Sequence, residues 1–460
     1  MAWFTQAGIR YKKSNCWYNI FKKTKELFSG GGTEKMENKV KMISGRKPVL
    51  GINGLGRIGK LTLWQHISRK SFSEIVVNIG RKVGTKLEDV ALYIEKDSTY
   101  GLLHQFLHGY KAKRVIENIN EEKGTMLIDD VPVTILRETR DPRQLPWGKH
   151  GAKVVVESTG TFKDPTAPPD AKGGSARGHL EAGAEKVIVS APFKIKEKGL
   201  SMPEDAATIV IGINDDKYDH AKHHIISAAS CTTTCLAYMI KPLLDYFSSK
   251  KILSASMATI HAATGTQEVL DRLPEAGATD LRKNRSIMNN IILTTTGAAK
   301  TLGLVIPEMN KIGFIAESVR IPISIGSLII LVVALSDEPG NEPIINRTLI
   351  NNIYRDAEQK EKRGYIKYTE EQNVSSDIIG HFGPATIIEG NETHTRTAYV
   401  TFDLNKLLKI PAKPLSGQLP NSMEIPVTQT VIYGWYDNEM GSYTNMLGDL
   451  TVKIASMVYQ

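Results

Sequence analysis

A cysteine at the start of a predicted helix is the residue of this sequence best suited to covalent chemistry. Ser230 is a candidate N-cap, and apolar residues then recur at helical spacing: Leu236, Ile240, Leu243, Leu244 and Phe247. Cys231 would therefore lie in the first turn of the helix. There, free backbone N–H groups and the helix dipole lower the pKa of a thiol and favour a nucleophilic thiolate.

A second cysteine, Cys235, stands one turn further along the same face, and we expect it to be a small core residue. A metal pair or a disulfide with Cys231 is the rival interpretation, but no second pair of ligands lies nearby in the sequence. An inert buried thiol at Cys231 is the remaining alternative. The cysteines thus predict a nucleophile and no metal.

A histidine at the end of a predicted strand offers a base for this thiol. Residues 252–260 predict the strand, and His261 follows it. A lone histidine at such a place is usually structural. The residues after it, AATGTQ, set Thr264 and Thr266 beside the imidazole, as an oxyanion or phosphate site requires. A thiolate paired with an imidazole is the arrangement for covalent catalysis at a carbonyl.

A glycine-rich turn predicts a dinucleotide site near the start of the folded chain. Residues 48–53, PVLGIN, predict a buried strand that runs into GLGRIG and then into a segment with helical spacing. Gly54 would make the tight turn, Gly56 would let the backbone approach a pyrophosphate, and Gly59 would let the helix pack closely. The N-terminus of that helix would then face the phosphates.

One part of the dinucleotide fingerprint is missing. The second predicted strand, residues 75–78, should be followed by an acidic residue that binds the ribose hydroxyls. Instead, the strand ends in Asn78 and continues with Ile79, Gly80, Arg81 and Lys82. Because nothing here repels a ribose 2′-phosphate, we expect weak discrimination between NAD, the default, and NADP.

The composition is that of a folded protein. With 460 residues, 41% of them hydrophobic and 23% charged, the chain is long enough for two or three domains and is not wholly disordered. No apolar run reaches the roughly 18–20 residues of a membrane span. Three cysteines are too few for a disulfide scaffold and fit a reducing compartment, so we expect a cytoplasmic location.

The net charge of +9 is concentrated in a basic N-terminal extension. Residues 1–47 hold eleven Lys or Arg and three Glu, whereas residues 48–460 hold 47 basic and 46 acidic residues, so no nucleic-acid partner is indicated for the body. The extension is interpreted either as a disordered tail or as a targeting segment. In a variant of the first interpretation, translation starts at Met36 or Met42. In the second case residues 17–28 would form a basic amphipathic helix for a membrane surface or organelle.

Longer motifs resemble the phosphorylating glyceraldehyde-3-phosphate dehydrogenase family, in order from about residue 48 to the C-terminus. They are GINGLGRIG at 51–59, ASCTTTC at 229–235, HAATGTQ at 261–267, TGAAK at 296–300 and WYDNE at 435–439. Shorter matches are DSTYG at 97–101, ESTG at 157–160, RIP at 320–322 and VSSD at 374–377. The nucleophile motif and WYDNE are together too rare to arise by chance.

This resemblance implies a reaction and its residues. Cys231 would attack the aldehyde of glyceraldehyde 3-phosphate, His261 would act as base, and inorganic phosphate would release 1,3-bisphosphoglycerate from a thioester, in glycolysis or gluconeogenesis. The substrate phosphate would lie near Thr264, Thr266 and Arg320. The attacking phosphate would lie near Ser230, Thr232, Arg285, Thr296 and Gly297.

The resemblance also implies the cofactor contacts. They are Gly54, Gly56, Arg57, Ile58, Gly59, Asn78, Ile79, Ser158, Thr159, Ser190 and Asn438. Of these, Asn438 would hold the nicotinamide carboxamide. The family order after WYDNE is an aromatic residue, Gly and Tyr, whereas this chain has MGSY at 440–443. The tyrosine is displaced by one place, so no cofactor contact is assigned to Tyr443.

The implied fold class is α/β. A Rossmann-like cofactor domain would span residues 48–230, and an α+β catalytic domain with a mixed or antiparallel sheet would span 231–440. A C-terminal helix near 441–460 would pack back on the first domain. Extra length at 163–180, 193–206 and 404–424 is expected in surface loops. Family members are typically homotetramers.

Two other functions stay open. Erythrose-4-phosphate dehydrogenase is similar to this family but releases a free acid and tolerates loss of the attacking-phosphate site, so the retained TGAAK and HAATGT motifs argue against it. A protein of this fold recruited to bind RNA or a surface is the alternative from another class. The intact Cys231 and His261 and the nearly neutral body make it secondary.

Overall fold

A computed structural model of the chain describes residues 48–337, 344–404 and 422–460. The predictions for the extension at 1–47 fall outside these residues, and so does most of the expected loop at 404–424. Among the described helices, none is both long enough and apolar enough to cross a bilayer.

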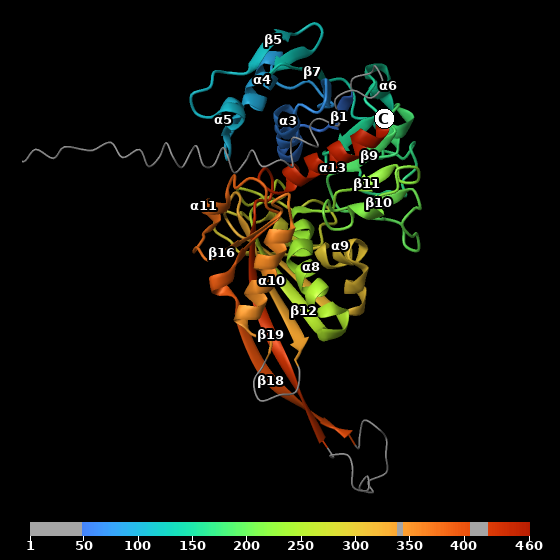
Figure 1. The fold of residues 1–460 in the computed structure, drawn as a ribbon. Helices are drawn as coiled ribbons and strands as arrows, with labels where there is room; N and C mark the ends of the chain where they lie inside the picture. The colour runs from blue at the N-terminus through green and yellow to red at the C-terminus, as the bar shows by residue number, and fades with distance from the viewer. Residues whose placement is uncertain (1–47, 338–343, 405–421) are drawn as a thin grey trace, which may run out of the picture. The chain divides into compact units, whose positions relative to one another are not determined.

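A nine-stranded sheet is built from the first half of the described chain (Figure 1), in the order β10-β11-β9-β8-β1-β2-β7-β6-β5. Its strands are β1 Val49–Asn53, β2 Glu74–Asn78, β5 Ile116–Asn120, β6 Thr125–Ile128, β7 Val131–Leu136, β8 Val154–Glu157, β9 Lys186–Val189, β10 Ala206–Thr208 and β11 Ile225–Ser227. From β10 to β7 the strands run parallel, and β6 and β5 add an antiparallel edge. Strands β1 and β8 are buried at every position, as expected for parallel strands that are covered on both faces.

The ends of the central strands lie in one row. Asn53 of β1 pairs with Asn78 of β2 and with Glu157 of β8, and Glu157 pairs with Val189 of β9. The segments that follow these strands therefore leave the sheet at one edge, where open α/β sheets bind their ligands.

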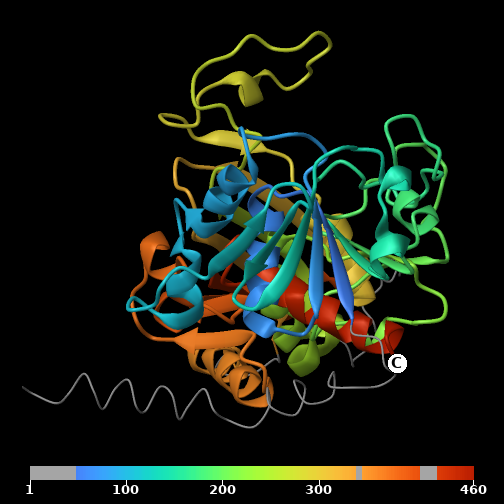
Figure 2. The same ribbon diagram turned by 90° about the horizontal axis from the view of Figure 1, so that it is seen from above.

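A C-terminal helix is fastened to this sheet and to the helix that follows β1. Helix α13, Tyr443–Val458, contacts α3, Arg57–Arg69, and β8; Figure 2 shows it crossing the strands. The guanidinium of Arg69 donates to the Asn445 carbonyl at 2.9 Å and to Asp449 at 3.0 Å. The C-terminal helix is thereby bound to the end of the helix that follows β1.

A second, eight-stranded sheet follows in the order β13-β14-β12-β15-β19-β17-β16, with β18 paired to β19. Its strands are β12 Ile252–His261, β13 Ile292–Thr294, β14 Gly313–Arg320, β15 Ser327–Ser336, β16 Ile366–Thr369, β17 Thr386–Glu389, β18 His394–Asp403 and β19 Ser422–Tyr436. Since β19 begins at Ser422, residues 422–424 are strand and not the expected loop. Both parallel and antiparallel pairs occur in this sheet, which confirms the α/β class with a mixed second sheet.

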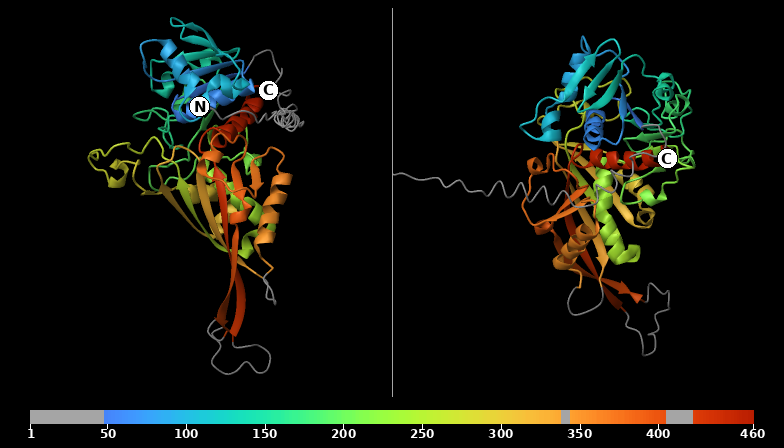
Figure 3. Two further views of the ribbon diagram at one scale, coloured as in Figure 1. Left: turned by 90° about the vertical axis from the view of Figure 1, so that its left-hand side faces the viewer. Right: turned by 45° about the horizontal axis from the view of Figure 1, so that its top comes forward.

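Helices cover one face of the second sheet. Helix α8, Cys231–Lys251, contacts β12, β15, β17 and β19 as well as α10, Arg347–Lys360, and α9, Ala298–Val305; Figure 3 shows α8 and α10 on the same side. Along β15 one set of side chains is buried beneath these helices and the alternate set is half-exposed on the other face. The alternate set is apolar: Leu328, Ile330, Val332 and Ala334.

Shorter elements complete the described chain. They are α4 Leu87–Glu95, β3 Lys96–Asp97, β4 Gly101–Leu102, α5 Leu103–His108, α6 Trp147–His150, α7 Gly178–Glu181 and α11 Ser375–Ile378. The expected loops at 163–180 and 193–206 contain no strand apart from the first residue of β10, and α7 begins in the last residues of the first.

Candidate active site

The predicted nucleophile stands at the first position of α8. Ser230 is the N-cap, and its hydroxyl oxygen accepts a hydrogen bond from the Thr233 backbone N–H at 3.1 Å, which confirms the predicted helix start. Cys231 is half-buried, whereas Cys235 is fully buried, as expected for a core residue. Both thiols are free, so they do not form the rival disulfide.

The structure brings the predicted thiol and base together. His261 is the last residue of β12, and its Nε2 lies 3.7 Å from the sulfur of Cys231. The start of α8 and the end of β12 thus meet at one edge of the second sheet. The pair can transfer a proton directly and does not require an intervening residue.

A chain of hydrogen bonds fixes which nitrogen of His261 faces the thiol. The backbone N–H of Ala262 donates to the Ser327 hydroxyl at 2.9 Å, and that hydroxyl donates to Oδ1 of Asn438 at 2.8 Å. The amide nitrogen of Asn438 then lies 3.3 Å from Nε2 of His261 and 4.0 Å from the Cys231 sulfur. Because an amide nitrogen only donates, Nε2 is the acceptor in this contact, and Nδ1, on the other side of the ring, lies 2.7 Å from the Ala262 carbonyl oxygen.

Electrostatics at this pair differ from the sequence-based expectation. Burial raises the pKa of the Cys231 thiol, an effect that the nearby guanidinium of Arg320 opposes. Burial and the charge of Arg320 lower the pKa of His261 to about 3. The predicted lowering of the thiol pKa by the helix start is therefore outweighed by the loss of solvent around the sulfur. A neutral imidazole faces a thiol, and its Nε2 is free to accept a proton.

Arg320 is the cation of the site. It ends β14, where it pairs in register with His261, and its guanidinium touches Nδ1 of His261 and donates to the Ala262 carbonyl at 3.1 Å. Its Nε is buried and has no hydrogen-bond partner among the described residues. A half-buried guanidinium with a spare donor suits an anionic substrate group.

The hydroxyls expected around the substrate phosphate are exposed and close to one another. Thr264 and Thr266 follow His261, and their hydroxyl oxygens are 3.0 Å apart. The backbone N–H and hydroxyl of Thr264 both donate to Oε1 of Gln267, at 2.8 and 2.7 Å. This short turn presents two hydroxyls to solvent beside the imidazole strand.

The residues expected around the attacking phosphate are only partly assembled. Thr296 and Gly297 precede α9, and the Thr296 hydroxyl accepts from the Ala298 N–H at 3.2 Å. Thr232 is buried, and its hydroxyl lies 3.0 Å from that of Tyr436, so it faces the core. Ser230 is used as the helix cap.

Arg285 is occupied by a local ion pair. Its Nε donates to Asp271 at 2.9 Å, and 64% of its side chain is exposed. The segment between β12 and β13 that carries it extends away from the sheets, as Figure 2 shows in yellow. Its place close to the attacking phosphate stays a prediction.

The glycine turn after β1 fits a dinucleotide pyrophosphate. Gly54 has a φ of +97°, and a Cβ on Gly59 would lie 2.0 Å from the Gly54 carbonyl oxygen. A Cβ on Gly56 would meet no atom within 4 Å. Helix α3 then starts with no side-chain cap and no acidic residue in its first turn. Its free N–H groups and dipole can therefore bind phosphate oxygens.

Several residues that were expected to contact the cofactor instead form hydrogen bonds to this turn and to the strand ends beside it. Ser158 donates its hydroxyl to the carbonyls of Asn53 and Gly54, at 2.9 and 3.0 Å. The backbone N–H groups of Thr159 and Ser190 donate to the carboxylate and the carbonyl of Glu157, at 2.8 and 2.9 Å.

Arg57 forms ion pairs with Asp97 and Glu439, while Ile58 is half-buried. Through these ion pairs Arg57 connects the glycine turn to the segment that carries Asn438.

The end of β2 lacks the acidic residue that usually binds the ribose hydroxyls, and hydrogen bonds of Asn78 hold this end in place. Asn78 is buried, and its side chain donates to Oδ1 of Asn53 at 2.8 Å and accepts from the Gly80 N–H at 3.0 Å. Ile79 is half-buried, and Arg81 and Lys82 are exposed.

A further cation, Arg140, was missed in the sequence. A Cβ on Gly80 would lie 2.8 Å from its Cγ, so its side chain lies against this turn. Only the pairing of β2 with β7 brings it there, although its place in TRDPR beside a strand was a usable signal.

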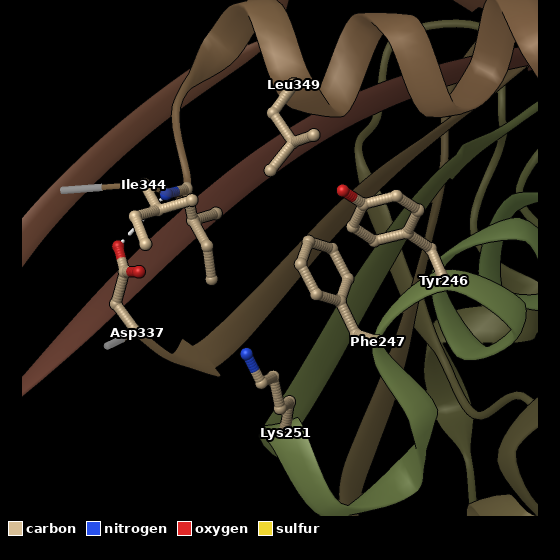
Figure 4. A pocket seen from close by; sticks show the side chains of 7 residues that line it. Tyr246, Phe247, Lys251, Asp337, Ile344 and Leu349 are labelled. Carbon is tan, nitrogen blue, oxygen red and sulfur yellow. Dashed lines mark hydrogen bonds between the residues drawn. The ribbon is translucent and has the colours of Figure 1, made fainter.

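A cavity elsewhere in the chain contains none of these residues. It measures about 190 Å³ and lies beside the far end of α8 (Figure 4), where it is lined by Tyr246, Phe247, Lys251, Asp337, Ile344, Ile345 and Leu349. Tyr246, the lining residue of α8 nearest to Cys231 in sequence, stands fifteen residues after it, roughly 22 Å along the helix.

Comparisons with known proteins agree with this geometry. Two family models match, "Glyceraldehyde 3-phosphate dehydrogenase, NAD binding domain" over residues 49–165 and "Glyceraldehyde 3-phosphate dehydrogenase, C-terminal domain" over residues 230–409. Glyceraldehyde-3-phosphate dehydrogenase 2 of Streptomyces avermitilis is 34% identical over 89% of this chain and 99% of its own length. The corresponding enzymes of Priestia megaterium and Bacillus subtilis are 34% and 33% identical, over 88% of this chain and 98% of theirs. A cysteine at a helix start beside a strand-end histidine, a glycine turn for a dinucleotide and these matches together show that the chain belongs to the glyceraldehyde-3-phosphate dehydrogenase family.

Proposed function

We propose that this protein is a phosphorylating glyceraldehyde-3-phosphate dehydrogenase that uses NAD or NADP. The observation that carries the proposal is the 3.7 Å approach of the Cys231 sulfur to Nε2 of His261, beside the half-buried guanidinium of Arg320. Small-molecule substrates and phosphate are what the family acts on. A thiol, a base and a cation at one point match an aldehyde that carries a phosphate group.

In the first step Cys231 attacks the aldehyde carbon. Nε2 of His261 takes the thiol proton, then gives it to the developing oxyanion, and takes it back from the hemithioacetal hydroxyl when that group is oxidised. Bound NAD(P) supplies the hydride acceptor for this oxidation, and a thioester remains on Cys231. Inorganic phosphate then attacks the thioester carbonyl, which releases 1,3-bisphosphoglycerate and restores the thiol.

The remaining residues bind and orient. Arg320, with Thr264 and Thr266, would bind the substrate phosphate. Ser230, Thr232, Thr296 and Gly297 would surround the attacking phosphate, provided that the Thr232 hydroxyl turns from Tyr436. Gly54, Gly56, Arg57, Ile58 and Gly59 would hold the pyrophosphate, with Asn78, Ile79, Ser158, Thr159 and Ser190 shaping the adjacent edge. Asn438 would hold the carboxamide while its nitrogen stays near the thiol.

The whole chain fits the family in its larger features as well. A cofactor domain at 48–230, a catalytic domain at 231–440 and the returning helix α13 remain our division of the chain. A homotetramer would cover the half-exposed apolar face of the second sheet, which also carries Ile315, 65% exposed. A cytoplasmic location is proposed because the whole chain fits this family.

One observation favours the second candidate, erythrose-4-phosphate dehydrogenase. The attacking-phosphate residues are incompletely assembled, since Arg285 is bound to Asp271 and Thr232 to Tyr436. An enzyme that hydrolyses its thioester with water does not need that site.

Phosphate dependence distinguishes the two activities. We expect NAD(P)H formation from glyceraldehyde 3-phosphate to require added inorganic phosphate and to exceed that from erythrose 4-phosphate. Cys231→Ser should abolish it, and Cys235→Ser, one helical turn away, should retain it. Turnover of erythrose 4-phosphate that is faster and independent of phosphate would establish the second candidate instead.

A further inference from the structure

The backbone just before the nucleophile has a conformation that its side chain disfavours. Ala229 is fully buried and has a φ of +56°, in the left-handed region that residues other than glycine rarely adopt. It precedes Ser230 and Cys231 directly. Its conformation therefore determines where α8 begins and in which direction the Cys231 sulfur points.

Two hydrogen bonds hold this residue. Its N–H donates to the Ser227 hydroxyl at 3.1 Å, and its carbonyl accepts from the hydroxyl of Tyr443 at 3.2 Å. The first bond comes from β11, two residues earlier. The second comes from the first residue of α13, more than two hundred positions later in the chain.

The position of Tyr443 is itself well defined. Its side chain is 4% exposed, and burial raises the pKa of its phenol, so it stays a neutral donor. The N–H of the next residue, Thr444, donates to the Glu439 carbonyl at 2.7 Å. The segment 438–443 thus touches the active site twice, with Asn438 near His261 and Tyr443 at Ala229.

The contact involves a position where the sequence departs from the family order. The chain reads Gly441-Ser442-Tyr443, so the tyrosine stands one place later than in that order. Ser442 is completely buried, and its hydroxyl has no partner among the described residues. In this chain the displaced tyrosine reaches the nucleophile turn.

We propose that Tyr443 is a positioning residue for Cys231. Its hydroxyl holds the carbonyl of Ala229 and so keeps the strained turn in the conformation that aims the sulfur at Nε2 of His261. Loss of the hydroxyl lets the turn relax toward a negative φ and moves the sulfur away from its base. This proposal concerns the thiol and rests on the proposed function only where turnover is measured.

The test removes one oxygen atom and compares two buried tyrosines. Tyr238 is the matched control, because it is 2% exposed and its hydroxyl donates to the Ile211 carbonyl at 2.7 Å, away from the nucleophile turn. In Tyr443→Phe we expect kcat and the alkylation rate of Cys231 by iodoacetamide to fall about fivefold to tenfold, the effect of one buried hydrogen bond. KM for NAD should stay unchanged. Tyr238→Phe should alkylate at the wild-type rate although its melting temperature falls comparably.

A second substitution separates positioning from general stability. Glycine adopts a positive φ without strain, so Ala229→Gly should make the turn less dependent on Tyr443. Tyr443→Phe should therefore slow alkylation less in the Ala229→Gly background than in the wild type. The proposal is overturned if Tyr443→Phe alkylates like the wild type, if both tyrosine variants slow alkylation equally, or if the two substitutions act independently. Because alkylation is measured without substrate, failure of the proposed enzymatic function would not affect this outcome.

Discussion

The imidazole of His261, the proposed base, is kept neutral by its surroundings, and its lone pair is oriented by them. Burial and Arg320 lower its pKa to about 3, and the Ser327 to Asn438 chain directs Nε2 to the thiol. The folded-state pKa lies well below neutrality, so the group stays unprotonated from about pH 5 upward. Acid inactivation above that pH should therefore not arise from His261.

Replacing His261 tests its proposed role as the base directly. His261→Asn should lower kcat by roughly 10²–10⁴-fold, the usual effect of removing a positioned general base. Alkylation of Cys231 should also slow near neutral pH, because the thiol proton loses its acceptor. Iodoacetamide kinetics of both proteins across pH 5–9 check this, and superimposed curves would show that the pair does not interact.

At this scale the sequence identified the partners but not their charge state. The helix start and the strand end were enough to predict Cys231 beside His261. The charge state could not be predicted, because it depends on burial in the folded chain and on the charge of Arg320, which comes from β14. The same limit applies to Arg285, whose side chain forms a local ion pair with Asp271.

At the scale of elements, we expect the edge of the first sheet to set the preference between NAD and NADP. Asn53, Asn78 and Glu157 share one row, so the residue after β2 lies beside the glycine turn. Ile79 occupies that place, with Arg81 and Lys82 exposed beyond it and Arg140 against Gly80. This edge contains cations and no carboxylate at the position that normally excludes a 2′-phosphate.

A substitution at Ile79 tests this account of the edge. Ile79→Asp should shift preference toward NAD, because a carboxylate accepts the ribose hydroxyls and repels the 2′-phosphate. Ile79→Asn, similar in shape but uncharged, is the matched control and should depress NADP use less. The measured quantity is the ratio of kcat/KM for the two cofactors. A wild type that already rejects NADP several hundredfold, or a ratio unchanged in Ile79→Asp, would contradict the account.

The elements themselves were largely predictable. Hydrophobic spacing and the Ser230 cap predicted α8, and PVLGIN predicted β1, because local sequence determines both. Arg140 was harder to predict than these elements, since the pairing of β2 with β7 is needed to bring it to Gly80. The contact of Tyr443 with Ala229 likewise depends on α13 returning to the start of α8.

At the scale of the whole molecule, the two sheets carry different parts of the candidate active site. The first presents a glycine turn and an uncapped helix N-terminus for a dinucleotide, and the second presents Cys231, His261 and Arg320 at strand and helix ends. Arg57, paired with Asp97 and Glu439, connects the turn to the segment that carries Asn438. The central claim is that this arrangement oxidises an aldehyde while it is covalently bound to Cys231.

Mass spectrometry of the acylated protein tests that claim most directly. The full chain is mixed with glyceraldehyde 3-phosphate and NAD in the absence of phosphate, quenched in acid and digested. We expect a phosphoglyceryl thioester on the peptide at Cys231, absent from Cys231→Ser and lost within seconds when inorganic phosphate is added before the quench. NADH formation without any adduct at Cys231, or an adduct at Cys235 that phosphate does not remove, would contradict the account.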